Sequence, residues 1–295
     1  MSAGRRRLRP RLVVFLLLAL GACERPEAAR DVGAPGPGTV TLVDAEGRTV
    51  RLAAPARRIV SLVPSATLTL AELGAAEAVV ARTDHDTAAW TAALPSVGGG
   101  LEPSLEAVAA ARPDLVVRFG GPQDPRTPAM LDDLGIAHVA IRPDGIEDIF
   151  ETVRLLGTAT GRTAEAEALV DRLRAGLDSV RAAATPLPTV RAAYLLGGSP
   201  PWVAGPGTYI HELLELAGGE NAFADLGSLY ASVSVEEFVA RPIDVLLTPR
   251  AGGVDARVST RARVVILGDA VELPGPGVVE AAWIVLRALH GEAVR

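Results

Sequence analysis

Apolar residues along this chain fall into short runs that alternate with helix-spaced patterns. The runs are bounded by Gly, Pro or polar clusters, as is typical of buried strands, and apolar residues three and four positions apart predict helices between them. The pattern opens with a hairpin, because Asp44-Ala-Glu-Gly47 separates two strand-like segments, 39–43 and 48–52. The next predicted strands are 58–63, 78–81, 115–118, 138–141, 191–196 and 264–267, and the predicted helices are 66–73, 128–134, 209–216 and 278–289.

A longer helical tract, 146–184, interrupts this alternation. Apolar residues recur along it at helical spacing, and Gly157 and Gly161 are the positions at which it is expected to kink or break. Because strands that alternate with helices form parallel sheets, the sequence predicts an α/β fold, with two α/β lobes joined by one long backbone helix. The predicted boundaries are 39–144 for the first lobe, 145–185 for the linking helix and 186–295 for the second lobe.

Two segments, 104–117 and 234–247, have the same internal spacing. In both, a serine lies two residues before a glutamate, the glutamate lies eight residues before an aspartate, and Arg-Pro leads into an apolar run. The serines are good N-caps, and Glu106 and Glu236 fall in the first helical turn, where the helix dipole favours negative charge. Stabilising a helix start is a sufficient role for either glutamate alone. The duplication favours a second role, in which two similar lobes each present one glutamate to a two-fold partner.

The N-terminus has the pattern of a secretory signal. Several arginines precede an apolar run, Leu12–Leu20, that is too short to span a bilayer, which needs ~20 residues. The last residue of this run begins the sequence Leu20-Gly-Ala-Cys23, which is similar to a bacterial lipobox. Cys23 is the only cysteine in the chain. The resemblance implies that 1–22 is a lipoprotein signal peptide, that Cys23 carries a lipid anchor, and that the Pro/Gly-rich 23–38 is a flexible tether. The alternative is a plain signal peptide with a chance cysteine at the cleavage position.

Composition indicates an acidic globular protein. The chain is 49% hydrophobic, 22% charged and 4% aromatic, so it has enough apolar residues to form a core. Its formal net charge is −6, and loss of the Arg-rich signal makes the remainder more acidic, which disfavours nucleic-acid binding. About 270 residues then remain, which is long enough for two domains. With Cys23 modified no thiol remains, so disulfides, thiolate metal sites and cysteine nucleophiles are excluded.

A family resemblance is carried, in order along the chain, by Arg58–Ser65, Val97–Gly100, Ser104–Asp114, Arg154–Gly161, Gly218–Asn221 and Val233–Glu236. Together these segments resemble the helical-backbone class of periplasmic substrate-binding proteins, which serve ABC importers for vitamin B12, ferric siderophores and haem. The resemblance covers 39–290 as one binding domain and implies a ligand cleft between the lobes. It also implies a monomer in the periplasm or on the cell surface that delivers its ligand to an ABC permease dimer with its ATPase subunits. The resemblance implies that the protein binds and delivers its ligand and catalyses no reaction.

Glu106 and Glu236 match the positions at which each lobe's glutamate meets an arginine of the permease in this class. A charged rim contact of this kind mainly sets orientation and on-rate. The resemblance therefore implies that the two glutamates are the permease-docking residues.

Within the class, one stretch is similar to vitamin B12-binding proteins. Ser199-Pro-Pro-Trp202-Val-Ala-Gly205 leads through a helix to Ala217-Gly-Gly-Glu-Asn221-Ala-Phe223. Such proteins have an aromatic after Pro-Pro and another just ahead of Val-Ser, where this chain has Trp202 and Tyr230. The resemblance therefore implies cobalamin as the ligand, since the large, mostly apolar face of a corrinoid suits aromatic walls.

Five residues are the candidate ligand contacts. Trp202 follows two prolines in a predicted loop, where exposed aromatics typically bind ligands, and Tyr230 is its counterpart ahead of Val-Ser. His85, where many relatives have Tyr, either stacks on a corrin, coordinates iron or cobalt, or is a solvated loop residue. Phe119 stands where relatives have a Trp. Arg250 follows a strand and either meets a phosphate or carboxylate of the ligand or is solvated.

The four histidines are scattered without a cluster, so the sequence predicts no dedicated metal site and no cofactor other than the ligand. Two other ligands stay open within the class. Arginines converging in the cleft would favour a ferric siderophore, and a His or Tyr at its centre would favour haem. An alternative of another class is an envelope lipoprotein acting as an enzyme or adhesin. The sequence contains neither a Walker motif nor a G-x-S-x-G elbow.

Overall fold

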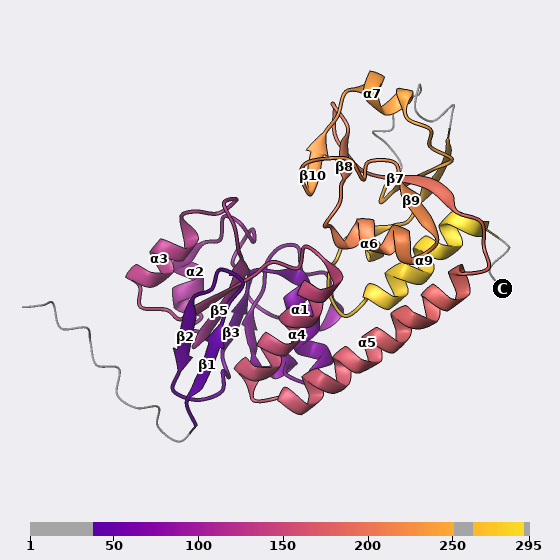
Figure 1. The fold of residues 1–295 in the computed structure, drawn as a ribbon. Helices are drawn as coiled ribbons and strands as arrows, with labels where there is room; N and C mark the ends of the chain where they lie inside the picture. Colours follow the sequence, from indigo (N-terminus) through magenta and orange to yellow (C-terminus); the bar gives the residue numbers. More distant parts are fainter. Residues whose placement is uncertain (1–37, 251–261, 292–295) are drawn as a thin grey trace, which may run out of the picture. The chain divides into compact units, whose positions relative to one another are not determined.

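The structure is a computed structural model of the chain, and it describes residues 38–250 and 262–291. The predicted signal peptide, Cys23 and nearly all of the predicted tether lie outside the described residues. Within them the chain forms two α/β lobes and the helices that connect them (Figure 1), which is the predicted fold class. None of the helices in this described part is long and apolar enough to cross a bilayer.

The first lobe is built on a four-stranded parallel sheet with strand order β4-β3-β5-β6. Its strands are short and mostly buried, as expected for parallel strands covered on both faces. A β1–β2 hairpin precedes the sheet, and its turn bonds to the edge strand, because the N–H of Ala45 donates to the carbonyl of Ala140 at 3.0 Å. The elements are β1 Val40–Val43, β2 Thr49–Leu52, β3 Ile59–Ser61, α1 Pro64–Glu72, η1 Ala76–Ala78, β4 Val79–Ala81, η2 Ala89–Thr91, α2 Leu105–Ala110, β5 Leu115–Phe119, α3 Thr127–Asp133 and β6 His138–Ile141.

The second lobe has a six-stranded mixed sheet in the order β10-β8-β7-β11-β12, with β9 also pairing β7. Strands β7, β9, β11 and β12 are parallel, and β8 and β10 extend the sheet in antiparallel pairing. The elements are β7 Val190–Gly197, β8 Trp202–Ala204, α6 Tyr209–Leu216, β9 Gly219–Asn221, β10 Tyr230–Ser232, α7 Val235–Ala240, β11 Val245–Thr248, β12 Arg263–Ile266, η3 Asp269–Val271 and α9 Val278–His290.

The hydrophobic pattern does not predict β8, β9 and β10. Each is three residues long, too short to show an alternation, and each depends on hydrogen bonds to a neighbouring strand. As a result Trp202 and Tyr230, expected in loops, are each the first residue of a strand.

Two consecutive helices, α4 Ile146–Thr160 and α5 Thr163–Ala184, form the predicted linking tract. The break falls at Gly161, which ends α4 in the left-handed region at φ 70°. Gly157 stays inside α4, where an added Cβ would lie only 2.4 Å from the Cβ of Ala166 in α5. The α5 helix packs against α4 of the first lobe and against α6 and α9 of the second (Figure 1). The linking segment is therefore a helix pair, of which α5 connects the two lobes.

The main apolar core is continuous from the first lobe through α4 and α5 to α6 and α9. Each sheet has a smaller core on its other face. In the first lobe this second core includes Val116 of β5 and Val108 of α2, and in the second it includes Leu246 of β11 and Phe238 of α7. The two repeated segments therefore pack in the same way in the two lobes.

Candidate functional site

The candidate ligand site lies at the carboxyl ends of the parallel strands, which is where α/β sheets bind ligands. In the second lobe these ends lead into Arg250 after β11 and Asp269 after β12. Direct contacts join the lobes close to the carboxyl end of β6, since the N–H of Tyr209 donates to the carbonyl of Asp144. The N–H of Ile146 also donates to the Glu212 carboxylate at 3.0 Å.

The first lobe contributes Phe119, the last residue of β5, whose side chain is half-buried. An added Cβ on Gly100 would lie 3.7 Å from the Phe119 ring and 2.3 Å from the carbonyl oxygen of Leu62, so only glycine fits there. The exposed His85 is held near this glycine segment, because the N–H of Asp84 donates to the carbonyl of Gly98 at 2.9 Å. Phe119 and the His85 loop thus flank the same glycine-rich segment.

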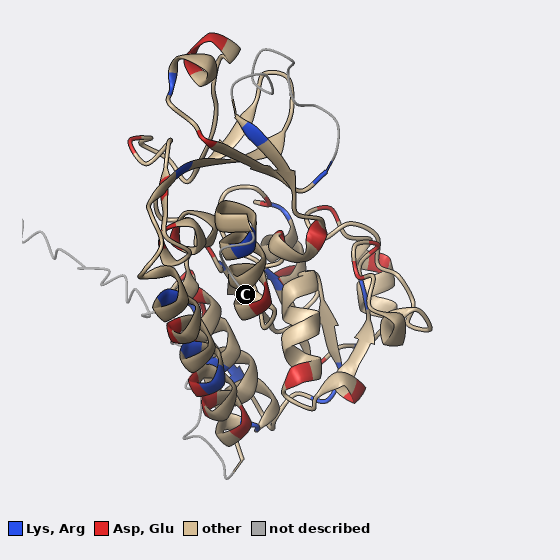
Figure 2. Ribbon diagram, turned by 90° about the vertical axis from the view of Figure 1, so that its right-hand side faces the viewer, with Lys and Arg blue, Asp and Glu red and all other residues tan. Residues whose placement is uncertain are grey.

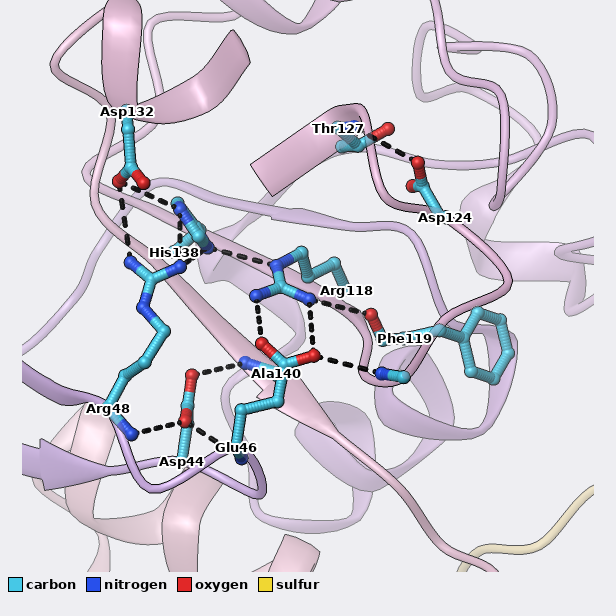
Figure 3. A network of polar contacts seen from close by, with 11 residues as sticks. Asp44, Glu46, Arg48, Arg118, Phe119, Asp124, Thr127, Asp132, His138 and Ala140 are labelled. Atoms are coloured by element: carbon cyan, nitrogen blue, oxygen red, sulfur yellow. Dashed lines mark hydrogen bonds and ion pairs between the residues drawn. The ribbon is translucent and has the colours of Figure 1, made fainter. Parts of the chain in front are cut away.

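A buried arginine lies directly before Phe119. Arg118 is only 1% exposed, and its guanidinium donates to the Glu46 carboxylate at 2.6 Å and to Nδ1 of His138 at 3.0 Å (Figure 3). Because Nδ1 accepts this bond, Nε2 of His138 carries the proton and donates to Asp132 at 3.1 Å. Burial, with Arg48 and Arg118 nearby, lowers the pKa of His138 and keeps the ring neutral. His138 is therefore a structural residue of this network.

Sequence reasoning missed this network. An arginine inside an apolar strand signals that it has a buried partner, because an unpaired buried charge is expensive. The partner, Glu46, lies 72 residues away in the hairpin turn, and no local spacing identifies it.

The second lobe contributes Trp202 of β8 and Tyr230 of β10. In the antiparallel register Trp202 is opposite Ser232 and Tyr230 is opposite Ala204, so the two aromatics are diagonal neighbours on one face. The Trp202 side chain is 48% exposed, and Tyr230 is half-buried. Burial raises the pKa of Tyr230 to about 12, so its hydroxyl stays protonated. The structure therefore brings these two predicted residues together.

Two further tyrosines lie beside Tyr230. Tyr209, at the start of α6, donates its hydroxyl to the carbonyl of Val271 at 3.0 Å. Tyr194 of β7 is 1% exposed, and its hydroxyl has no hydrogen-bond partner among the described residues. Burial raises the pKa of both phenols, and that of the nearby Glu272 carboxyl as well. No sequence pattern singled out Tyr194 or Glu272, because a tyrosine in an apolar strand is ordinarily a core residue.

Arg250 is exposed and already has acidic neighbours. Its guanidinium lies 3.2 Å from the carboxylate of Asp269 and 3.6 Å from that of Glu272. Its charge is therefore balanced by the protein, which weakens its predicted role as the contact for an anionic ligand group.

The two repeated helix starts have the predicted local geometry. Ser104 Oγ accepts the N–H of Ala107 at 3.2 Å, and Ser234 Oγ accepts the N–H of Glu237 at 3.0 Å. Glu106 and Glu236 are exposed in the first turns of α2 and α7, outside the network around Arg118. The capping role of the serines is confirmed, and the glutamates are accessible to a partner.

Charged side chains elsewhere are largely paired with one another. The chain contains no lysine, so every blue segment in Figure 2 is arginine. Along α4 and α5 the two signs alternate, with Glu147 bridged to Arg154 and to Arg174. No group of three or more His, Cys, Asp or Glu in the described ranges could hold a metal ion.

Comparisons with known proteins agree with this arrangement. A family model described as periplasmic binding protein matches residues 59–265. A cobalamin-binding protein of Halobacterium salinarum is 31% identical over 285 residues, covering 86% of this chain and 75% of that protein. The periplasmic vitamin B12 binding protein BtuF of Vibrio cholerae superposes with a TM-score of 0.68 at 23% identity, covering 80% of this chain and 97% of that one. The apo heme-binding protein RhuT from Roseiflexus sp. RS-1 gives 0.66 at 26% identity, covering 79% and 99%.

The two α/β lobes and the connecting helix have the fold of these proteins, and the family model and the Halobacterium relative are those of solute-binding proteins. The chain belongs to the periplasmic binding protein family, in the class of ABC-importer proteins with vitamin B12-, siderophore- and haem-binding members. The family and the fold predicted from the sequence are confirmed, and the relatives are solute-binding proteins, as predicted, and not enzymes.

Proposed function

We propose that this chain binds cobalamin or a closely related corrinoid between its lobes and delivers it to an ABC permease. The observation that carries the proposal is the pairing of Trp202 with Tyr230 on one face of β8 and β10. Together they offer an extended apolar wall beside the strand ends, which suits the face of a large macrocycle. The Halobacterium relative, named a cobalamin-binding protein, supports the same ligand.

The first lobe supplies a second, smaller apolar surface. Part of the Phe119 ring is accessible, and the glycines next to it let the backbone approach a ligand closely. An apolar ring on one lobe and an aromatic pair on the other would contact a flat ligand from two sides.

Haem is the second candidate, and His85 is the observation that favours it. The imidazole is exposed and makes no hydrogen bond within the described residues, so either ring nitrogen is available to iron. The heme-binding neighbour RhuT is 26% identical to this chain. A ferric siderophore is less favoured, because Asp269 and Glu272 already balance the charge of Arg250.

The permease and the lipid anchor complete the proposal. Glu106 and Glu236, exposed on equivalent helix starts in the two lobes, would each meet an arginine of a two-fold permease. Cys23 lies outside the described residues, and the support for its lipidation is the lipobox-like sequence around it. Replacement of Cys23 by serine should move the protein from the membrane fraction to the soluble fraction. A protein still retained in the membrane fraction would contradict the lipid anchor.

Fluorescence titration tests the ligand. Purified protein is titrated with cyanocobalamin, haemin and a ferric siderophore, and quenching of tryptophan emission is recorded. Cyanocobalamin should give saturable quenching at or below micromolar concentration, and Trp202→Ala should weaken binding. Trp283→Phe, on α9 against the main core, is the control and should leave the affinity unchanged. Absence of a response to cyanocobalamin, together with saturable haemin binding that His85→Ala abolishes, would replace cobalamin with haem.

A further inference from the structure

The β1–β2 hairpin lies outside the part of the chain that the family model matches, since that match begins at residue 59. Its turn nevertheless reaches the first lobe's half of the proposed ligand site. Glu46, at the tip, bonds across 72 residues to Arg118 and across 75 residues to Gly121. The hairpin is therefore connected to the loop that follows β5.

Glu46 bridges two parts of this loop. One carboxylate oxygen accepts from the Arg118 guanidinium at 2.6 Å, and the other accepts the backbone N–H of Gly121 at 2.9 Å (Figure 3). Arg118 also donates to the carbonyl of Phe119 at 2.9 Å. The carboxylate and the guanidinium thus hold the backbone on both sides of Gly120, at Gly121 and at Phe119. Phe119 is the residue proposed to contact the ligand.

Arg118 has few alternatives to this partner. The Arg118 side chain is 1% exposed and that of Glu46 is 30% exposed, so loss of the carboxylate would leave a buried guanidinium without charge compensation. The neutral His138 ring accepts the Nε–H at 3.0 Å but supplies no charge. Glu46 is the carboxylate bonded to the guanidinium in the described part of the chain.

The loop itself has little freedom to adopt another shape. Gly120 donates its N–H to the carbonyl of Ile141 at 2.9 Å, and an added Cβ there would lie 2.9 Å from Cγ of Arg142. Gly121 has a φ of 102°, in the region that glycine tolerates best. Because the backbone from Phe119 to Gly121 is constrained in this way, the position of the Phe119 ring depends on where Glu46 holds that backbone.

We infer that Glu46 and Arg118 are positioning residues for Phe119, so that the hairpin sets the first lobe's half of the ligand site. This inference rests on the proposed function, because it takes Phe119 as a ligand contact. Neither Glu46 nor Arg118 touches the ligand; both act by holding the loop.

The test compares Glu46→Gln with a matched variant of the same hairpin, Val50→Ala. The glutamine keeps the size of the side chain but removes the charge that compensates Arg118. Val50 is buried in the main core on β2 and takes no part in the bonds of Glu46 to Arg118 and Gly121, so Val50→Ala weakens hairpin packing while keeping those bonds. In full-length protein, Glu46→Gln should raise the Kd for cyanocobalamin about five- to tenfold, while Val50→Ala leaves the Kd unchanged. The Gly121 amide resonance should shift in Glu46→Gln and stay in place in Val50→Ala.

Three outcomes would overturn the inference: a wild-type Kd for Glu46→Gln, an equal loss of affinity in both variants, or an unshifted Gly121 resonance. If Glu46→Gln does not fold, Glu46→Asp takes its place, since the shorter side chain cannot bridge Arg118 and Gly121 together. The Gly121 resonance is read without ligand. A wild-type protein that fails to bind cyanocobalamin would therefore refute the proposed ligand, while the resonance still decides whether Glu46 positions the loop.

Discussion

The carboxylate of Asp114 accepts the backbone N–H of Arg58 at 3.0 Å, and its own N–H donates back to the Arg58 carbonyl at 2.8 Å. The second lobe repeats this arrangement, because Asp244 accepts the N–H of Arg191 at 3.2 Å and donates to the Arg191 carbonyl at 2.9 Å. Each aspartate therefore joins the end of its repeated segment to the start of the first strand of its sheet. An aspartate stands at the same position of each repeated segment because it makes the same pair of backbone bonds in both lobes.

Replacement of Asp114 by alanine should destabilise the protein by about 1 kcal/mol, because an exposed carboxylate–amide bond contributes an amount of this order. Asp244→Ala should cost a similar amount. Urea unfolding measures both, and Asp133→Ala is the control, since this exposed carboxylate on α3 makes no hydrogen bond or ion pair with the rest of the described chain. Asp114→Ala with the stability of the Asp133→Ala control would show that the backbone bonds of Asp114 contribute nothing.

The two glutamates can be separated from the helix caps by a paired experiment. Glu106→Ala combined with Glu236→Ala should abolish ligand import while leaving ligand affinity intact, because both carboxylates lie on exposed helix starts. Ser104→Ala combined with Ser234→Ala removes the caps and keeps the carboxylates. This control should cost about 1 kcal/mol of stability per cap and leave import unchanged. Import that survives in the glutamate variant, measured as uptake of labelled ligand in whole cells, would mean that these residues only stabilise helix starts.

Glu46 should make stability depend on acid pH. The hydrogen bond from Arg118 is the main cause that lowers the Glu46 pKa from 4.5 to about 2. A carboxyl with a lowered folded-state pKa contributes stability that is fully present above its unfolded pKa and is lost as the pH falls through the folded value. The free-energy difference between wild type and Glu46→Gln should therefore be about 2 kcal/mol at neutral pH and shrink between pH 4.5 and 2. Urea unfolding across this range measures it, and a pH-independent difference would contradict the assignment.

The sequence predicted most of the strands and helices, because these have strong local periodicity. The helix at Tyr209–Leu216 and the strand at His138–Ile141 have the predicted bounds. What could not be predicted depends on pairing between distant segments. Strand β8 exists because β7 and β10 bond to it. The network of Arg118 has the same origin, since only the folded sheet brings the hairpin turn beside β5.

Trp202 and Tyr230 were singled out because they stand at recognisable positions in a family-like stretch, and the structure places them as neighbours on β8 and β10. Their contact with a ligand stays a prediction. The position of Arg250 after a strand also predicted a ligand contact there. The sequence could not show that Asp269, after the next strand, lies 3.2 Å from the Arg250 guanidinium. The hydrogen-bond partners of buried hydroxyls could not be predicted either, because periodicity identifies a buried position but not the atoms that surround its polar group.

Tyr194 gives the last prediction. Its buried hydroxyl has no partner within the described residues, and an unsatisfied buried polar group is costly, so Tyr194→Phe should stabilise the protein by about 1 kcal/mol. Tyr209→Phe is the matched control, because it removes a hydroxyl that donates to the carbonyl of Val271 at 3.0 Å and should destabilise the protein by about 1 kcal/mol. Urea unfolding at neutral pH, where burial keeps both phenols protonated, compares the two. A loss of stability in Tyr194→Phe as large as that in Tyr209→Phe would show that the Tyr194 hydroxyl is hydrogen-bonded in solution.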